Sequence, residues 1–356
     1  MLTSRLQAWL SRSSQPKGTS QVDDLPVVLG TDVGLHRSEN QDVVIFARIG
    51  SHHSEPTLIA LVADGMGGMV DGRTCACLAV ASFVSVLALR EHLDLSTRLV
   101  VALKQANEDV FGFSDGRGGS TMAAIAIQSN HEPVFAYVGD SRIYGLRRGE
   151  QTEVVRLTVD DSLEDAFGGH GRGLLNFLGM GEGLVPHVAS LPKEVHSVFL
   201  STDGVHFIHA SVFENILAEA PGVKSIIERS LALARWCGGP DNASAVALDI
   251  GNDALLGALH AKDSIEIWDP FSKLELIYVD SKAPPAKARL VLSAGDKKNE
   301  RWLVGAPNEP KEISEDPDSP QKVFQKRRAR KLRTSKGKEN SDTVPQLTIQ
   351  VGTGSD

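Results

Sequence analysis

Short runs of apolar residues, each the length of a β-strand, recur along the first 250 residues of the chain. They are rich in valine and isoleucine, which favour strands, and polar or glycine-containing turns separate them. A further hairpin is expected at residues 144–155, around the turn Arg148-Gly149-Glu150. We predict six main strands, at residues 43–49, 58–63, 122–127, 134–138, 197–200 and 245–250.

Between these strands, apolar residues recur at helical spacing in two pairs of segments. The first pair covers residues 72–91 and 96–111, and the second covers residues 211–219 and 223–237. Strict alternation of strand and helix would indicate a parallel sheet, whereas helices that come two at a time favour antiparallel sheets covered by helices. The pattern therefore predicts an α+β fold.

The pattern changes after residue 250, where four more strand-like runs occur. Residues 265–268 and 276–279 flank a turn, and residues 289–292 are expected to form a second hairpin with residues 301–304. These strands either form a small β-module or extend an edge of the main sheet. We divide the chain into a flexible N-terminus (1–21), a main domain (22–250), a small β-rich extension (251–307) and a disordered, acidic then basic tail (308–356).

Composition and charge narrow the class of protein. With 356 residues, 41% of them hydrophobic and 23% charged, the chain can bury a full core and still carry an appended module. A net charge of −8 argues against nonspecific binding of nucleic acid by the whole molecule. Residues 322–338, however, hold nine basic residues and no acidic one. We interpret this run as a solvated tail, with binding to nucleic acid, anionic lipid or an acidic partner as the alternative.

The cysteines and the N-terminus indicate the compartment. Three cysteines, two of them in apolar sequence, do not suit a disulfide framework and indicate a reducing environment. The first twenty residues contain no apolar stretch of the kind that a signal peptide needs. The longest uncharged run, residues 74–89, is short for a membrane span and suits a core helix. We expect a cytoplasmic monomer.

Aspartates provide the candidate chemistry. Four of them occur where a strand-like run meets a tight turn, and a fifth directly precedes a strand. Any one alone is an ordinary turn residue. Together they match the need of Mg²⁺ or Mn²⁺ for several carboxylate oxygens from separate segments, and no His/Cys cluster of zinc type competes. The five are Asp42, Asp64, Asp140, Asp203 and Asp241.

Such a site suits phosphate-ester chemistry. Two bridged metal ions lower the pKa of a shared water and polarise a phosphoryl oxygen. Arg37 is a candidate for binding the phosphate, because a guanidinium offers two parallel donors, and a solvated surface arginine is the alternative. Gly65 follows Asp64, and its lack of a side chain lets its carbonyl approach an ion.

The order of these motifs resembles the PPM family, the type-2C metal-dependent protein Ser/Thr phosphatases, in its bacterial form. The resemblance covers about residues 22–250. It implies a four-layer αββα sandwich of two antiparallel sheets flanked by helix pairs, and hydrolysis of phosphoserine and phosphothreonine. It rests on Thr31-Asp32-Val33-Gly34, residues 37–42, residues 64–68, Gly119-Ser120-Thr121, Gly139-Asp140-Ser141-Arg142, residues 157–162, Ser201-Thr202-Asp203-Gly204 and Asp241-Asn242.

The resemblance also implies roles for the metal-binding residues. Asp64, Asp203 and Asp241 would bind two Mn²⁺ or Mg²⁺ ions, with Asp64 bridging both and the Gly65 carbonyl joining the second. Asp140 would help to hold a third ion.

Three neighbouring residues would assist the metals. Arg37 would orient the phosphate, and Asp42 would hydrogen-bond metal-bound water. Gln41 stands where many relatives have a glutamate that reaches a metal through water. An opposing Ser/Thr kinase is the expected partner enzyme.

Two departures from the family pattern affect the mechanism. Met66 stands where animal relatives have a histidine proposed as the general acid. Bacterial relatives share the methionine. Asp161 replaces the histidine of the bacterial Asp-His-Ser stretch, which concerns the contacts of the flap, residues 160–179.

Two alternatives to a protein phosphatase are a phosphatase for a non-protein phosphoester and a catalytically silent module that binds a phosphoprotein or a kinase.

Overall fold

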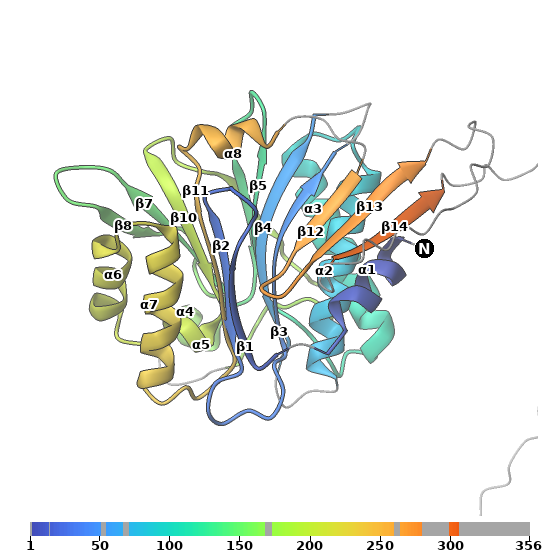
Figure 1. Ribbon diagram of the computed structural model, residues 1–356. Helices are drawn as coiled ribbons and strands as arrows, with labels where there is room; N and C mark the ends of the chain where they lie inside the picture. The colour runs from blue at the N-terminus through green and yellow to red at the C-terminus, as the bar shows by residue number, and fades with distance from the viewer. Residues whose placement is uncertain are drawn as a thin grey trace, which may run out of the picture. The chain divides into compact units, whose positions relative to one another are not determined.

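A computed structural model describes residues 2–13, 15–50, 55–66, 71–167, 173–259, 264–279 and 299–305. These residues belong to one structural unit, residues 1–307, in which two β-sheets face each other (Figure 1). The predicted tail, 308–356, lies outside the described residues.

The smaller sheet has six strands, and every pairing in it is antiparallel. Two of the predicted strands and the predicted hairpin at residues 144–155 are part of it. In spatial order the strands are β1 (Lys17–Gln21), β2 (Val27–Asp32), β11 (Ala243–Asp249), β10 (Val195–Ser201), β7 (Arg142–Arg147) and β8 (Glu153–Arg156).

The larger sheet has eight strands and contains the other four main strands predicted from sequence. Its pairings are antiparallel except for the last one, between β13 and β14. In spatial order the strands are β14 (Asn299–Gly305), β13 (Lys273–Val279), β12 (Ser264–Trp268), β3 (Asp42–Ile49), β4 (Thr57–Asp64), β5 (Met122–Gln128), β6 (Val134–Val138) and β9 (His187–Ser190).

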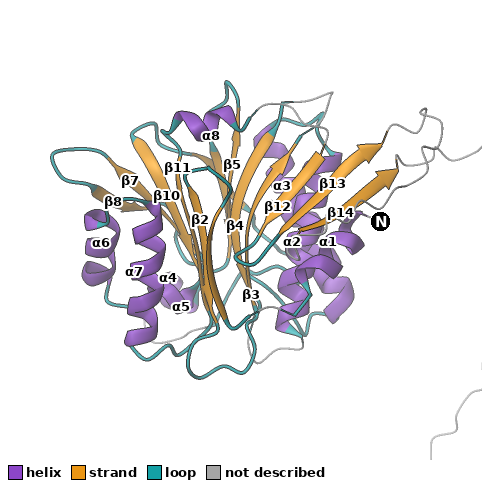
Figure 2. Cartoon of the chain, viewed as in Figure 1, coloured by secondary structure: helices purple, strands orange, loops and turns teal. Residues whose placement is uncertain are grey.

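Helices cover the outer faces of both sheets (Figure 2). The helix pair α2 (Gly72–Leu89) and α3 (Leu95–Ser114) covers the larger sheet, and the pair α6 (Ala210–Glu219) and α7 (Val223–Trp236) covers the smaller one. One hydrophobic cluster fills the space between the sheets, and two more fill the spaces between each sheet and its helices. The four-layer αββα sandwich is therefore confirmed.

Helix α2 is the one described helix long and apolar enough to cross a membrane by length and composition. In this fold 72% of it is buried, against the larger sheet and against α3. Its cysteines, Cys75 and Cys77, are buried and form no disulfide bond, as expected of a core helix.

The prediction of a flexible N-terminus was wrong. Helix α1 (Leu2–Leu10) packs on α2 through the buried side chains of Leu6, Trp9 and Leu10. Strand β1 follows and pairs with β2 along its whole length. Its sequence, Lys-Gly-Thr-Ser-Gln, has no apolar residue because an edge strand is half-exposed, so hydrophobic pattern could not reveal it.

The extension after residue 250 lengthens an edge of the larger sheet, which was one of the two alternatives. Strand β12 pairs with β3, and β13 pairs with β12 around the predicted turn at residues 269–272. The expected second hairpin differs, because β14 pairs with β13 in parallel. Its other expected strand, residues 289–292, lies outside the described residues.

Three short helices complete the described fold. They are α4 (Leu163–Phe167), which lies within the flap, α5 (Asp203–His206), which follows β10 directly, and α8 (Asp253–Gly257), which lies at the end of the sandwich remote from α5 (Figure 1).

Candidate active site

Two of the candidate carboxylates come from neighbouring strands of the larger sheet. Asp42 begins β3 and Asp64 ends β4, and the two residues are directly opposite in the antiparallel register. Residues paired in this way have their side chains on the same face of the sheet. The pairing therefore places the two carboxylates together at one end of the sandwich.

Two more carboxylates reach the same end from the smaller sheet. Asp203 is the first residue of α5, two residues after the end of β10, and Asp241 lies just before β11. Their turns touch, because a Cβ atom on Gly204 would lie 1.9 Å from the carbonyl oxygen of Asn242. Only glycine permits so close an approach at that position.

Hydrogen bonds join the two sheets at this point. The Thr202 hydroxyl donates to Oδ2 of Asp42 across 2.9 Å. The Asn242 side chain accepts from the backbone N–H of Gln41 (2.8 Å) and donates to the carbonyl of Val33 (2.9 Å). These contacts hold the segment that precedes β3 against the segment that precedes β11.

Asp140 belongs to the same electrostatic group. It lies in the turn between β6 and β7, next to Gly139, whose φ of +97° is a glycine conformation. Burial, and then repulsion from Asp203 and Asp160, raises the pKa of Asp140 to about 7. The structure thus brings the fourth turn aspartate within electrostatic reach of the others.

The pKa values of Asp42 and Asp64 are also raised. Burial raises the pKa of Asp42 to about 7, against the hydrogen bonds it accepts from Ser244 and Thr202. Burial, and then the charges of Asp42 and Asp203, raise the pKa of Asp64 well above its ordinary value. Carboxylates gathered in this way repel one another unless a cation neutralises them.

Arg37 lies among these acids. Its guanidinium donates to Oδ2 of Asp241 across 2.7 Å and remains partly exposed, with 41% of the side chain accessible. The hydrogen bond to Asp241 raises the pKa of Arg37, and the charges of Asp64 and Asp203 contribute. Arg37 is thus an exposed arginine that lies beside a candidate metal ligand, and its role toward a phosphate stays a prediction.

Gly65 and Gln41 occupy a tight turn beside Asp64. The Gly65 N–H donates to the Gln41 carbonyl across 3.2 Å. A Cβ on Gly65 would lie 2.1 Å from the carbonyl oxygen of Gly72, so no other residue fits there. The roles expected of the Gly65 carbonyl and of the Gln41 side chain toward a metal stay predictions.

The donor set suits a hard divalent cation. Every candidate ligand is an oxygen, and Oδ1 of Asp42 is buried without a hydrogen-bond partner in the described part of the chain. As the side chains stand, no three His, Cys, Asp or Glu groups of the described residues are grouped closely enough to hold an ion. The metal-ligand assignments of Asp64, Asp203, Asp241 and Asp140 therefore stay predictions.

Sequence reasoning missed several residues that organise the site. Thr202 and Asn242 belong to motifs visible in the sequence, but their bridging hydrogen bonds depend on the fold. Arg73 donates to the carbonyl of Asp42 and, across 3.0 Å, to the carbonyl of Leu10. No sequence signal marks Arg73, because its partners are backbone atoms of distant segments.

Comparison with known proteins identifies the family. The family model described as "Protein phosphatase 2C" matches residues 36–242, more than half of the chain and the whole span from Arg37 to Asn242. The chain belongs to the protein phosphatase 2C family.

Individual relatives are bacterial. The chain is 29% identical over 238 residues to the serine/threonine protein phosphatase PstP of Mycobacterium tuberculosis, a match that covers 62% of this chain and 44% of that protein. It is 34% identical over 155 residues to the protein phosphatase PhpP of Streptococcus pneumoniae, covering 39% of this chain and 56% of the relative. The chain thus spans less than half the length of the mycobacterial proteins that it matches.

Solved structures share the fold of this family member. The serine/threonine phosphatase PstP/Ppp of M. tuberculosis superimposes with a TM-score of 0.53 at 24% identity, covering 64% of this chain and 98% of that one. The S. agalactiae serine/threonine phosphatase gives a TM-score of 0.54 at 24% identity, covering 63% and 98%. At this identity the likeness establishes the two-sheet architecture.

Proposed function

We propose that this protein phosphatase 2C family member hydrolyses phosphoserine and phosphothreonine in proteins, with Mn²⁺ or Mg²⁺ as cofactor. The observation that carries the proposal is the convergence of Asp42, Asp64, Asp203 and Asp241 from two sheets, with Arg37 beside them. The relatives named as serine/threonine phosphatases support this activity, and so does a PstP structure described as a complex with two manganese ions.

The residues divide the work as follows. Asp64, Asp203 and Asp241, with the carbonyl of Gly65, would hold two metal ions, and Asp140 would help to hold a third. When bound, such ions supply an activated water and polarise the phosphoryl oxygens.

The other site residues act on the substrate and its water. Arg37 binds and orients the phosphate with paired N–H donors, from a partly exposed position that a substrate can reach. Asp42, held by Thr202, presents its second carboxylate oxygen as an acceptor that can orient a water proton.

Substrate and setting follow from the same chemistry. The substrate class is a phosphorylated protein, so the enzyme would oppose a Ser/Thr kinase in signal transduction. We propose a cytoplasmic location on the grounds of the cysteine content.

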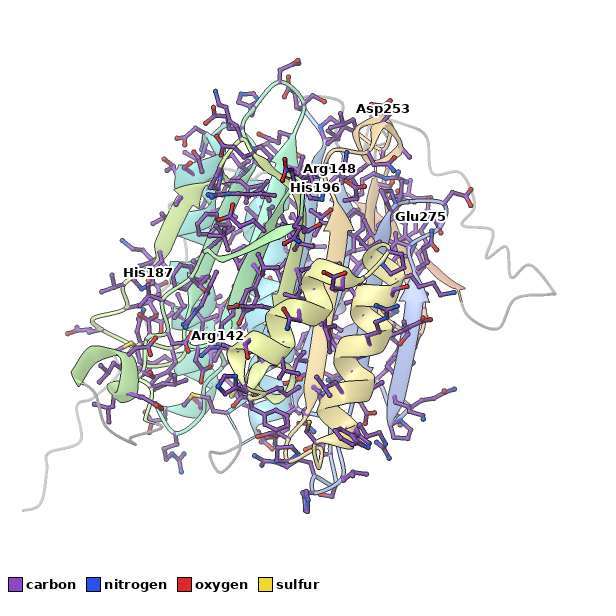
Figure 3. The ribbon with its side chains drawn as sticks, turned by 90° about the vertical axis from the view of Figure 1, so that its left-hand side faces the viewer. Arg142, Arg148, His187, His196, Asp253 and Glu275 are labelled. Carbon is purple, nitrogen blue, oxygen red and sulfur yellow. The ribbon has the colours of Figure 1, made fainter. Side chains whose placement is uncertain are left out.

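The test is release of phosphate from a phosphothreonine peptide by the purified full chain with Mn²⁺. Asp203→Ala is expected to lower kcat/KM by about a hundredfold or more, because it removes a charged ligand. Asp253→Asn is the control, because Asp253 lies in α8, which is remote from α5 and therefore from Asp203 (Figure 1). Figure 3 shows Asp253 at the end of the molecule away from Arg142.

Three results would count against the proposal. Unchanged activity of the Asp203 variant would remove the site assignment. Turnover of small esters without turnover of phosphopeptides would indicate a non-protein substrate. Metal binding without turnover of any substrate would indicate a silent binding module.

A further inference from the structure

The carboxylate of Asp161 joins three separate segments. Its Oδ2 accepts hydrogen bonds from the N–H of Gly139 (3.0 Å) and from Nδ2 of Asn176 (2.7 Å). Its Oδ1 lies 2.9 Å from Nε2 of His187. One side chain thus connects the turn before Asp140, the flap beyond α4 and strand β9.

Backbone hydrogen bonds reinforce the same connections. The N–H of Asp161 donates to the carbonyl of Gly139 across 3.1 Å, and the N–H of Leu175 donates to the carbonyl of Asp161 across 2.8 Å. The Gly139 turn is itself confined, because a Cβ there would lie 2.7 Å from the side chain of Thr121. The flap is therefore attached to a sterically confined part of the Asp140 turn.

His187 extends the network to the strand that precedes this turn. Its ring stacks on Tyr137 of β6 with centroids 4.5 Å apart and planes 16° from parallel. The Tyr137 hydroxyl accepts from the N–H of Val159, one residue before the flap, across 3.3 Å. His187 and Arg142 are labelled in Figure 3, at the starts of β9 and β7.

The far end of the flap is attached without Asp161. Leu178 and Ser120 exchange backbone hydrogen bonds of 2.9 and 2.8 Å. The Asn107 side chain accepts from the N–H of Gly179 across 2.9 Å. The side chains of Phe177 and Met66 both lie against Gly119. This end of the flap is therefore close to Met66, which is two residues from Asp64 in the sequence. Asp161 therefore holds the entrance of the flap together with Asp160, whose carboxylate accepts hydrogen bonds from Arg142 (2.6 Å) and from Arg156.

The segment held in this way exposes apolar side chains. Val159, Leu163 and Leu175 are 66%, 39% and 44% exposed, and they lie around Asp161 in sequence and in hydrogen bonding. A small phosphoester that fills only the phosphate site does not reach side chains outside it, whereas a peptide is long enough to contact them. Displacement of the flap should therefore affect a peptide substrate more than a small one.

We propose that Asp161 is a positioning residue that holds the flap against the Asp140 turn and thereby sets the preference for phosphopeptides over small phosphoesters. The proposal rests on the phosphatase function proposed above. It gives a role to the contacts that Asp161 makes at the position where the bacterial Asp-His-Ser stretch has a histidine.

The experiment compares Asp161→Ala with Glu164→Gln, which removes an exposed charge from the same flap. An alanine at 161 has no side-chain acceptor for Gly139, Asn176 or His187. We measure KM and kcat with Mn²⁺ for a phosphothreonine peptide and for p-nitrophenyl phosphate, and hydrogen exchange of the described flap residues 160–167 and 173–179.

For Asp161→Ala we expect kcat/KM to fall about tenfold for the peptide, mainly through KM, and less than about twofold for p-nitrophenyl phosphate. Exchange of the flap amides should become faster. Glu164→Gln should leave kcat/KM for both substrates and the exchange rate of the flap amides unchanged. His187→Gln, which keeps two of the three Asp161 contacts, should shift them in the same direction by less, and it serves if the Asp161 variant does not fold.

Two outcomes would overturn the proposal: equal losses for both substrates with unchanged exchange, or variants at 161 and 187 that behave like Glu164→Gln. A wild-type protein that releases phosphate from neither substrate would instead refute the proposed function. The exchange measurement would still decide whether Asp161 holds the flap.

Discussion

Replacing Glu266 with glutamine should destabilise the protein, because Glu266 is a buried charge held by two cations. Its side chain is 1% exposed, at the middle of β12. Arg48, its register partner on β3, forms an ion pair with it, and Nζ of Lys273 on β13 lies 2.7 Å from its Oε1. The cluster therefore links three adjacent strands of the larger sheet.

The magnitude follows from which charges would be left unpaired. Breaking a buried ion pair by removing one partner costs about 3–5 kcal/mol. Arg48 and Lys273 keep 13% and 23% of their side chains exposed, so water can partly solvate them. We expect Glu266→Gln to lower the free energy of unfolding by about 3 kcal/mol at pH 7, the lower end of that range.

The effect should depend on pH. Burial favours the neutral form of Glu266, but hydrogen bonds from Lys273 and Arg48 outweigh it and lower the pKa below its ordinary value of 4.5. A lowered carboxyl pKa stabilises the folded state above the unfolded pKa, and the stabilisation is lost as pH falls through the folded value. The difference between wild type and variant should therefore shrink below about pH 4.5.

Urea unfolding at pH 7 and at pH 4 or below measures both effects. The control is Glu153→Gln, which removes an exposed ion pair: the Glu153 side chain is 65% exposed and lies 3.6 Å from Arg147. That variant should cost less than about 0.5 kcal/mol. A loss below about 1 kcal/mol for Glu266→Gln, or a loss that stays constant down to acid pH, would refute the reasoning.

Two further predictions concern the site and its surroundings. Burial, and then two nearby arginines, lower the pKa of His206 well below 6.5, so unfolding below that pH adds a proton and the free energy of unfolding should fall by up to about 1.4 kcal/mol per pH unit. His206→Gln should flatten this slope between pH 7.5 and 5.5, and equal slopes would contradict the assignment. Gly65→Ala places a Cβ 2.1 Å from the Gly72 carbonyl and should abolish Mn²⁺ binding in calorimetry. Gly112→Ala, which meets nothing within 4 Å in α3, should stabilise by about 0.5–1 kcal/mol and keep Mn²⁺ binding, and equal titrations for the two variants would count against the role of Gly65.

The central sheets could be predicted from sequence because their strands are buried on both faces. All six residues of β2 are buried, as are seven of the eight in β4, and such strands read as continuous apolar runs. Strand β2 was nevertheless not among the predicted strands, although it begins with the apolar run Val27-Val28-Leu29. The edge strand β1 had no pattern to detect.

The candidate site was predicted as a set of residues, and its geometry was not. Turn aspartates after strands are visible in the sequence, and register then explains why Asp42 and Asp64 share one end of the sheet. The bridge from Thr202 to Asp42 and the contacts of Asp161 depend on segments far apart in the chain. Long-range hydrogen bonds between polar turns leave no periodic signal, so only the fold reveals them.

Residues at both ends of the described chain support the strand that begins at Asp42. Arg12, which follows α1, contacts Asp269 and Ser272 in the turn between β12 and β13. Since Arg73 joins the carbonyls of Leu10 and Asp42, the N-terminal helix, the appended hairpin and the site form one connected scaffold. The segments that the sequence marked as accessory therefore belong to the structural unit that positions the candidate active site. Shortening either end should disturb the start of β3 rather than release an independent catalytic domain.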